Sequence, residues 1–467
     1  MTHRAMRTVG MDQPVPVLGG EMWRYVNLDN GASTPPLVEV QEALERFLPW
    51  YSSVHRGAGL KSQVATERLE AARLTVLRFV GANPATHTAL FGANTTEAIN
   101  RLAALYPFEP GDVVLLTGME HHANDLPWRA RTEVSYVAVS DRGELDLNDL
   151  EAKLKRYQGR VRLLSVSGAS NVTGFVNPIH TIARLAHAHG AQIVVDAAQL
   201  APHRPIAMAQ ANPAEAIDFL ALSGHKLYAP YGGGALIAPL DFVNTAVPDR
   251  WGGGAVTVVG HGELHLTTGP DRLEPGSPNT LGVIALAAAM ETLMAQSMEQ
   301  VDAHERHLTT YALERLRQVE GIQLYGSDDP ARTADRVGVI PFNLGDLPHG
   351  LVAAILAQEW GIGVRSGCFC AHPYVTHLLG VRGEAYEQFR DRALAGDRAD
   401  IPGMVRVSFG CYTTEAEVDL LVEALHRIAR GEYRQGYRLD PATGEYSHPD
   451  YAALTHRFLH GKPPSHA

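Results

Sequence analysis

Short apolar runs alternate with amphipathic stretches through the first half of the chain. Each run is four to six residues long and leads into a turn, which predicts a buried strand. The runs occupy residues 88–91, 113–117, 134–139, 161–166, 192–196, 217–222 and 235–238. Helical spacing occurs at 37–50, 62–80, 95–105, 146–157 and 178–189. This alternation predicts an α/β fold with a mostly parallel sheet between helices, which binds ligands at the carboxyl ends of its strands.

The pattern changes after Pro275. Two long helical patterns are followed by shorter strands and helices, which predicts a second, smaller α/β domain. The helical patterns lie at 283–294, 301–319, 349–360 and 414–430, and the strands at 322–325, 337–342, 363–365 and 405–409. We therefore expect a flexible arm (1–24), a segment that packs with the small domain (25–36), a large domain (37–282), a small domain (283–430) with a charged, partly helical insertion (382–403), and an extension (431–467).

Composition narrows the possible partners. The 467 residues include 51 acidic and 40 basic ones, a net charge of −11, which argues against a general nucleic-acid binder. Three cysteines do not make a disulfide framework. No run is long and uncharged enough for a membrane span, and no signal peptide is apparent. These features predict a cytoplasmic protein without nucleic-acid or membrane partners.

One of the five lysines, Lys226, has an unusual setting, between a predicted buried strand and the glycines at 232–234. Burying an ammonium is costly unless something compensates for it. A lysine that forms a Schiff base with a carbonyl cofactor is one such case. An ordinary surface lysine is the alternative that the local pattern leaves open.

Polar residues follow several of the other strands. Thr95 and Thr96 open a helix after Asn94, where free N–H groups and hydroxyls suit a phosphate, although an ordinary helix cap has the same pattern. Asp196 ends a strand, where it could pair with the protonated ring nitrogen of pyridoxal phosphate or simply cap a helix. His121 could stack on a planar cofactor or be a loop histidine. Asn171 could bind a ring substituent or hold a turn.

The cysteines at 368 and 370 lie in a segment with glycine and cationic neighbours. Such a setting suits a thiolate nucleophile. Cys368, Cys370 and His372 could instead form half of a metal site, but no second pair with zinc-like spacing follows, so we expect no metal. A Cys368–Cys370 disulfide is geometrically awkward at that spacing.

Together these motifs resemble the class V aminotransferase family of pyridoxal-phosphate enzymes. Within it, the chain is similar to the Suf-type cysteine desulfurases, also called selenocysteine lyase-like, over residues 25–430 without the insertion. The matching motifs lie at 28–33, 54–57, 94–100, 119–124, 170–174, 195–199, 223–228, 274–279 and 365–371. The resemblance implies a fold type I architecture, in which the large domain holds a mostly parallel seven-stranded sheet.

The resemblance also implies which residues would hold pyridoxal 5'-phosphate. Lys226 would form the Schiff base, Asp196 would pair with the pyridinium nitrogen, and Gln199 with the phenolic oxygen. His121 would stack on the ring and relay protons. The phosphate would be held by Thr95, Thr96, Ser223 and His225 and, from the partner subunit, by Gly276 and Ser277. The last pair implies a homodimer with a composite active site.

The substrate implied by the resemblance is L-cysteine. Arg406 would clamp its carboxylate, and the substrate side would be lined by Asn171, Arg365, His55 and Arg56. Cys370 would take the sulfur as a persulfide, release L-alanine and pass the sulfur to an acceptor protein.

The chain also departs from this pattern. The Suf-type pattern carries two histidines directly before the nucleophile, where this chain has Cys368 and Phe369, and we expect the insertion to cover the site. Two alternatives stay open: a carbon–sulfur lyase, epimerase or aminotransferase-like enzyme with another amino-acid substrate, and a non-enzymatic scaffold whose thiols serve a metal or redox role.

Overall fold

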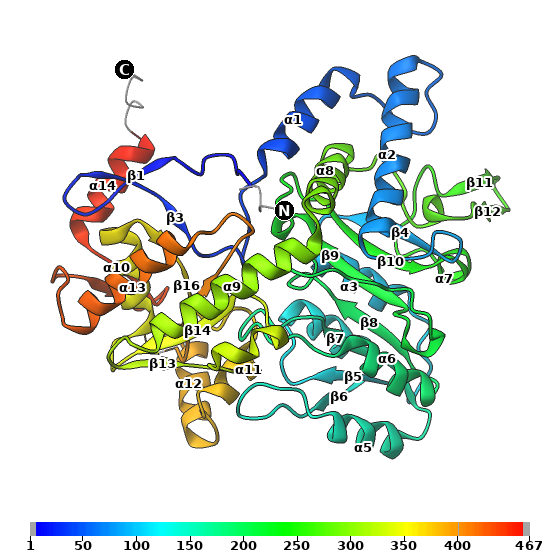
Figure 1. The fold of residues 1–467 in the computed structure, drawn as a ribbon. Coiled ribbons are helices and arrows are strands. Elements are labelled where there is room, and N and C mark those ends of the chain that lie inside the picture. Colours follow the sequence, from blue (N-terminus) through cyan, green and yellow to red (C-terminus); the bar gives the residue numbers. More distant parts are fainter. Residues whose placement is uncertain (1–5, 400, 461–467) are drawn as a thin grey trace.

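A seven-stranded sheet is the centre of the computed structural model, which describes residues 6–399 and 401–460 (Figure 1). The strand order is β4-β10-β9-β8-β7-β5-β6, and β10 alone runs antiparallel to its neighbours. The strands are His87–Gly92 (β4), Val113–Thr117 (β5), Glu133–Val137 (β6), Val161–Ser167 (β7), Gln192–Asp196 (β8), Phe219–Ser223 (β9) and Gly234–Pro239 (β10). Every predicted run forms one of them, so the predicted fold class is confirmed.

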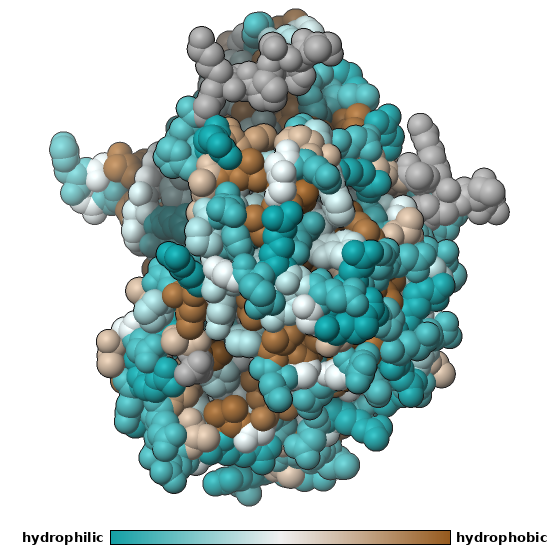
Figure 2. All heavy atoms as spheres, turned by 90° about the vertical axis from the view of Figure 1, so that its left-hand side faces the viewer, coloured by the Kyte–Doolittle hydropathy of each residue, from teal (hydrophilic) through white to brown (hydrophobic). Residues whose placement is uncertain are grey.

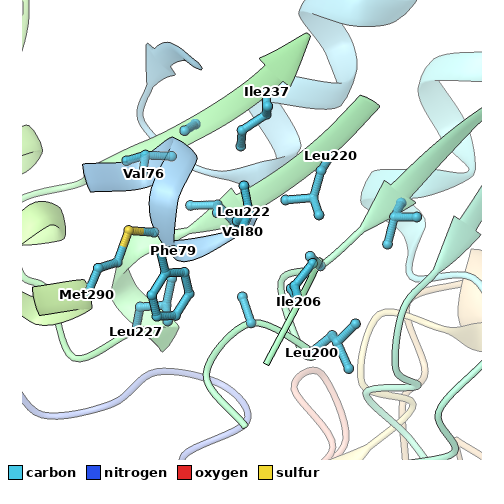
Figure 3. Close-up of a cluster of buried hydrophobic side chains, with 14 of the residues drawn as sticks. Val76, Phe79, Val80, Leu200, Ile206, Leu220, Leu222, Leu227, Ile237 and Met290 are labelled. Atoms are coloured by element: carbon cyan, nitrogen blue, oxygen red, sulfur yellow. The ribbon is translucent and has the colours of Figure 1, made fainter. Parts of the chain in front are cut away.

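Helices cover both faces of this sheet because its buried strands present apolar side chains on both sides. One face is covered by α2 (Leu60–Phe79), α5 (Leu147–Tyr157), α6 (Ile179–Ala188) and α8 (Thr280–Gln296). The other carries α3 (Thr95–Leu105), α4 (Leu126–Arg129) and α7 (Leu240–Thr245). Figure 3 shows Leu220, Leu222 and Ile237 of the sheet beside α2. Leu227, the residue after Lys226, lies in the same cluster near Met290 of α8. The core therefore holds the turn that carries Lys226 in place.

A four-stranded antiparallel sheet, in the order β13-β14-β17-β16, forms the smaller unit. Its strands are Ile322–Leu324 (β13), Val339–Leu344 (β14), Met404–Ser408 (β17) and Arg365–Gly367 (β16). Its core includes side chains of α9 (Met298–Leu316), α10 (His349–Trp360) and α13 (Glu415–Ala429). Near the N-terminus, β3 (Val26–Asn27) pairs in parallel with β15 (Ile362–Gly363), which attaches the segment after Tyr25 to this unit.

The flexible arm expected at residues 1–24 is wrong for residues 6–24, and residues 1–5 lie outside the described part. β1 (Pro14–Pro16) and β2 (Met22–Arg24) form a hairpin. The side chains of Val17 and Leu18 are buried, and the Leu18 N–H donates to the carbonyl of Gln358 on α10 at 2.7 Å. Apolar residues between the glycines and prolines therefore hold this segment against the small unit.

The insertion and the C-terminal extension lie against each other. The insertion follows α11 (His372–Leu378) and contains α12 (Glu384–Leu394), and the extension contains β18 (Arg438–Asp440), β19 (Glu445–Ser447) and α14 (Pro449–His460). The Arg398 N–H donates to the carbonyl of Pro441 at 2.7 Å. The insertion was expected to cover the site, but none of its described residues lines the cavity that holds Lys226.

The small unit and the extension form an outer face that is mostly hydrophilic, with hydrophobic residues between the polar side chains (Figure 2). The remaining elements are α1 (Val38–Phe47) and a projecting hairpin of β11 (Val256–Val259) and β12 (Leu264–Leu266) (Figure 1). Among the described residues, no single helix has the length and apolar composition to cross a membrane. α8 and α9 meet these two criteria only when taken together, and the pair is bent by 77°.

Candidate active site

A cavity of about 410 Å³ is lined by the carboxyl ends of the large sheet's strands, residues of the small sheet and the turn after β3. It gathers twelve of the sixteen predicted site residues. These are Thr95, Thr96, His121, Asn171, Asp196, Gln199, Ser223, His225, Lys226, Arg365, Cys370 and Arg406. Strands that run in parallel bring their carboxyl ends to one edge, so residues far apart in the sequence meet there.

Lys226 lies on a short helical turn (Gly224–Lys226) directly after β9. Its Nζ lies 3.4 Å from Oε1 of Gln199. Burial lowers the pKa of the Lys226 ammonium to about 8, although the nearby carboxylate of Asp196 opposes the shift. A lysine with such a pKa is partly neutral, and therefore nucleophilic, near pH 8.

This pKa predicts how fast the cofactor-free protein takes up pyridoxal phosphate covalently. The rate should rise about tenfold per pH unit below pH 8, because the neutral amine fraction does so, and should level off above it. Stopped-flow measurement of the growth of visible absorption between pH 6 and pH 10 checks this. A rate that still climbs steeply at pH 10 would mean that Lys226 has an ordinary pKa.

Asp196 and Gln199 lie beside Lys226, in the segment that follows β8. Asp196 is buried, which raises its pKa, and its Oδ1 accepts the N–H of Ala198 at 2.9 Å. The Nε2 of Gln199 is buried without a hydrogen-bond partner among the described residues. A buried N–H left without an acceptor is costly, so this donor suits an oxygen of a bound ring. The site therefore fits pyridoxal phosphate, with an acid for the ring nitrogen and a donor for the phenolic oxygen.

The N-terminus of α3 makes the other end of the cavity. Asn94 caps this helix by accepting the Glu97 N–H at 3.0 Å. The Oγ of Ser223 accepts the Thr95 N–H at 2.8 Å and donates to the Thr95 hydroxyl at 2.8 Å. Hydroxyls at a helix N-terminus of this kind suit the phosphate group. Thr96 and His225 line the same cavity.

His121 follows β5 and is held as a neutral imidazole. Its Nδ1 accepts the N–H of Ala123 at 3.0 Å, which leaves the proton on Nε2. Burial, helped by the charge of Lys226, lowers its pKa to about 3. His121 can therefore stack on a ring and carry a proton at Nε2 without being charged.

The preceding residue, Glu120, was not predicted as a site residue. It is buried, and its carboxylate accepts the Ser167 hydroxyl at 2.7 Å and the Asn124 amide at 2.6 Å. Burial raises its pKa to about 7. Glu120 thus fixes the loop that carries His121. The sequence feature that could have identified Glu120 is its position directly before two histidines in the loop after a strand.

The segment around Cys370 has an unusual backbone. Phe369 (φ 52°) and Cys370 (φ 55°) are both left-handed, which costs non-glycine residues roughly 1–2 kcal/mol each. The His122 N–H donates to the Cys370 carbonyl at 2.7 Å, and the Asn171 amide donates to the Phe369 carbonyl at 2.7 Å. These bonds hold the thiol of Cys370 at the cavity. The Nδ2 of Asn171 therefore serves the cysteine segment, whereas the sequence predicted a contact with cofactor or substrate.

The two neighbouring cysteines differ in access. Cys370 is exposed and lines the cavity, whereas Cys368 is buried and its thiol donates to the Pro402 carbonyl at 2.8 Å. Burial raises the pKa of Cys368 to about 12. Of these two cysteines, only Cys370 is therefore placed where its sulfur can reach a substrate in the cavity.

Arg406, on β17, lies at the small-unit side of the cavity and is buried. It donates to the Asn171 carbonyl at 2.9 Å and to Oδ1 of Asp29 at 3.0 Å, and its guanidinium lies 5.0 Å from the centre of the Phe369 ring. Arg365 lies 3.8 Å from Oδ2 of the same aspartate. Asp29 was not predicted as a site residue.

Four predicted residues, His55, Arg56, Gly276 and Ser277, do not reach this cavity. They line a separate hollow together with Asp271, whose Oδ1 lies 3.6 Å from Nδ1 of His55. Within one chain, the expectation that His55 and Arg56 line the substrate side is therefore not met. No group of three or more His, Cys, Asp or Glu side chains suited to a metal occurs in the described ranges.

Comparisons with known proteins agree with this geometry. The sequence profile of the family described as Aminotransferase class-V matches residues 26–421. A cysteine desulfurase from Dickeya dadantii (strain 3937) is 36% identical over 418 residues, which cover 86% of this chain and 92% of the relative. The apo structure of a cysteine desulfurase from Thermococcus onnurineus NA1 has a TM-score of 0.77 at 31% identity, over 87% of this chain and 95% of that one. The cysteine desulfurase CsdA (S-sulfonic acid) from Escherichia coli has a TM-score of 0.73 at 29% identity, over 88% and 96%.

Proposed function

The chain belongs to the aminotransferase class-V family, and on that premise we propose that it is a cysteine desulfurase that uses pyridoxal phosphate to convert L-cysteine to L-alanine. The observation that carries the proposal is that Lys226 and the exposed thiol of Cys370 line one cavity, with Arg406 beside them. A lysine alone would fit many reactions of this cofactor class. A thiol at the same cavity adds an acceptor for sulfur.

Arg406, Lys226 and His121 have separate roles in the proposed reaction. When bound, the cofactor withdraws electrons from the substrate's α-carbon. Arg406 binds the substrate carboxylate, because a buried guanidinium makes strong charge-assisted bonds with a carboxylate. Lys226, neutral above about pH 8, takes and returns the α-proton at Nζ. His121 covers the ring and holds a proton at Nε2.

Cys370 carries out the sulfur step. Its thiolate attacks the substrate sulfur, so that an S–S bond forms and the substrate's Cβ–S bond breaks. The electron pair of the broken bond stays with Cβ, which takes a proton and leaves as L-alanine. The sulfur remains on Cys370 as a persulfide, which faces solvent and can pass to an acceptor protein.

A homodimer completes the proposal. Gly276 and Ser277 do not line the cavity of their own chain, which supports their acting in the cavity of a partner subunit. His55 and Arg56 line the same hollow as Gly276 and Ser277, so in such a dimer they would also lie next to the second copy of the chain. We propose cytoplasmic localisation, as the composition suggests.

The proposal is tested by a substrate screen of the purified protein loaded with pyridoxal phosphate. With L-cysteine and a reductant, alanine and sulfide should be released in equal amounts. In a parallel reaction without reductant, which would otherwise remove the persulfide, mass spectrometry should find an added sulfur on the peptide spanning 366–373. Alanine release without that modification would favour a carbon–sulfur lyase. No reaction with L-cysteine, but turnover of another amino acid, would contradict the desulfurase assignment.

A further inference from the structure

His122, the residue after His121, bonds the segment that carries Cys370 at two points. Its N–H donates to the Cys370 carbonyl at 2.7 Å, and the Nε2 of its ring accepts the N–H of His372 at 3.2 Å. The cysteine segment, residues 368–372, is therefore held on both sides of Ala371, directly after the thiol. His122 itself does not line the cavity.

The cysteine segment needs such support because its backbone is strained. Phe369 and Cys370 have φ angles of 52° and 55°, which residues with a side chain adopt only where their surroundings fix them. Before the thiol, the Asn171 amide holds the Phe369 carbonyl at 2.7 Å. The two bonds of His122 restrain the chain on the other side of the thiol.

The ring of His122 can accept an N–H because it is uncharged at neutral pH. Burial lowers the pKa of the His122 imidazole, and the nearby His372 and Arg129 lower it further, although the carboxylate of Asp125 opposes them. The His372 ring lies against it with the centroids 4.9 Å apart, and the His121 ring lies at 6.4 Å. A neutral imidazole keeps a lone pair on one nitrogen, and here that nitrogen is Nε2, which faces the His372 N–H.

We propose that His122 is a positioning residue, whose ring holds the thiol of Cys370 toward a substrate in the cavity. Without the bond to Nε2, the strained backbone of the cysteine segment is free to relax and to carry the thiol away from the substrate sulfur. A small misplacement of a reacting group lowers its rate strongly. The inference rests on the proposed function, because it takes Cys370 as the group that attacks the substrate.

The test compares His122→Phe with His122→Gln in protein loaded with pyridoxal phosphate. Phenylalanine keeps the ring and the backbone N–H but removes the acceptor, whereas glutamine offers an amide oxygen at a similar reach. Hydrogen exchange of the peptide spanning 366–373, followed by mass spectrometry, should be roughly five- to tenfold faster in His122→Phe, the effect of one lost hydrogen bond. His122→Gln should exchange at close to the wild-type rate, and peptides far from the cavity should be unaffected in both variants.

The same proteins should differ in the sulfur step. In His122→Phe, the single-turnover rate of alanine formation from L-cysteine should fall roughly ten- to a hundredfold. The concentration of L-cysteine that gives half the maximal rate and the visible absorption of the cofactor should stay the same, because the ring of His122 touches neither ligand. His122→Gln should recover most of the rate.

A matched control is His448→Phe. The Nδ1 of His448 also accepts a backbone N–H at 3.2 Å, that of Asp450, and its ring also lies edge-on to an aromatic neighbour, Tyr437. It belongs to the C-terminal extension and does not line the cavity. His448→Phe should speed exchange only around its own position and keep the rate of alanine formation.

Three results would overturn the proposal. They are unchanged exchange or an unchanged single-turnover rate in His122→Phe, equal losses in His122→Phe and His122→Gln, and faster exchange throughout the chain, which would give His122 a merely structural role. If His122→Phe does not fold, His122→Ala, which adds no volume, makes the same comparison. Faster local exchange that glutamine reverses, together with no alanine from L-cysteine in the wild type, would leave the hold on the cysteine segment standing and contradict only the proposed function.

Discussion

Lys226→Ala is expected to abolish the visible absorption that pyridoxal phosphate gains on covalent attachment, and to lower turnover of L-cysteine by roughly a thousandfold or more. Lys226 is the one lysine of the cavity lining, with a pKa lowered to about 8 by burial. Among the described residues, no other side-chain amine lines the cavity to replace it. Absorption spectra of the purified variant and alanine release measure the two effects.

The matched control is Lys155→Ala. Lys155 is 64% exposed and paired with Glu151 on the surface. It should keep both the spectrum and the turnover, because an exposed ion pair contributes little. Retention of the absorption band in Lys226→Ala would refute the cofactor assignment altogether.

Cys370→Ala should lower alanine and sulfide release from L-cysteine by roughly a hundredfold or more, while leaving the visible spectrum unchanged, because it removes the sulfur acceptor but none of the cofactor's predicted contacts. Cys368→Ala should keep most of the activity, since its thiol is buried, bonded to the Pro402 carbonyl and raised in pKa to about 12. Its effect should be a loss of stability of about 1 kcal/mol.

The pair of variants separates the candidate nucleophiles. Alanine release is measured with reductant present, and thermal melting reports folding of each variant. Equal loss of activity in both variants, with both folded, would move the nucleophile to Cys368. Unchanged alanine release in Cys370→Ala would favour the lyase reaction.

The sequence predicted the large sheet well because most of its strands are buried on both faces and so appear as apolar runs, although the edge strand β6 is partly exposed. The polar residues predicted at the ends of these strands then include most of the predicted residues that line the cavity. Val17 and Leu18 show where the prediction failed. Their apolar side chains stand among prolines and glycines without periodicity, and the Leu18 N–H bonds the carbonyl of Gln358, which is far away in the sequence.

The sequence did not identify Asp29 as a site residue for a related reason. It reads as part of a turn, and its partner Arg406 lies 377 residues away. Likewise, the amide of Asn171 binds the carbonyl of Phe369, a contact made by backbone that no spacing of residue types announces. The pattern of apolar and polar residues locates helices and strands. Which polar groups meet between the large and the small unit depends on how the two units pack together.

The contact between the insertion and the C-terminal extension has a consequence for the history of this chain. Gly444 of the extension approaches the backbone of Arg398 in the insertion so closely that a side chain at 444 would collide with it, whereas Tyr446 of the extension packs beside Gly350 on α10 of the small unit. The insertion and the extension therefore fit each other closely where Arg398 meets Gly444. We therefore expect homologues to carry both segments or neither, because a homologue with only one of them would expose the surface that the other covers.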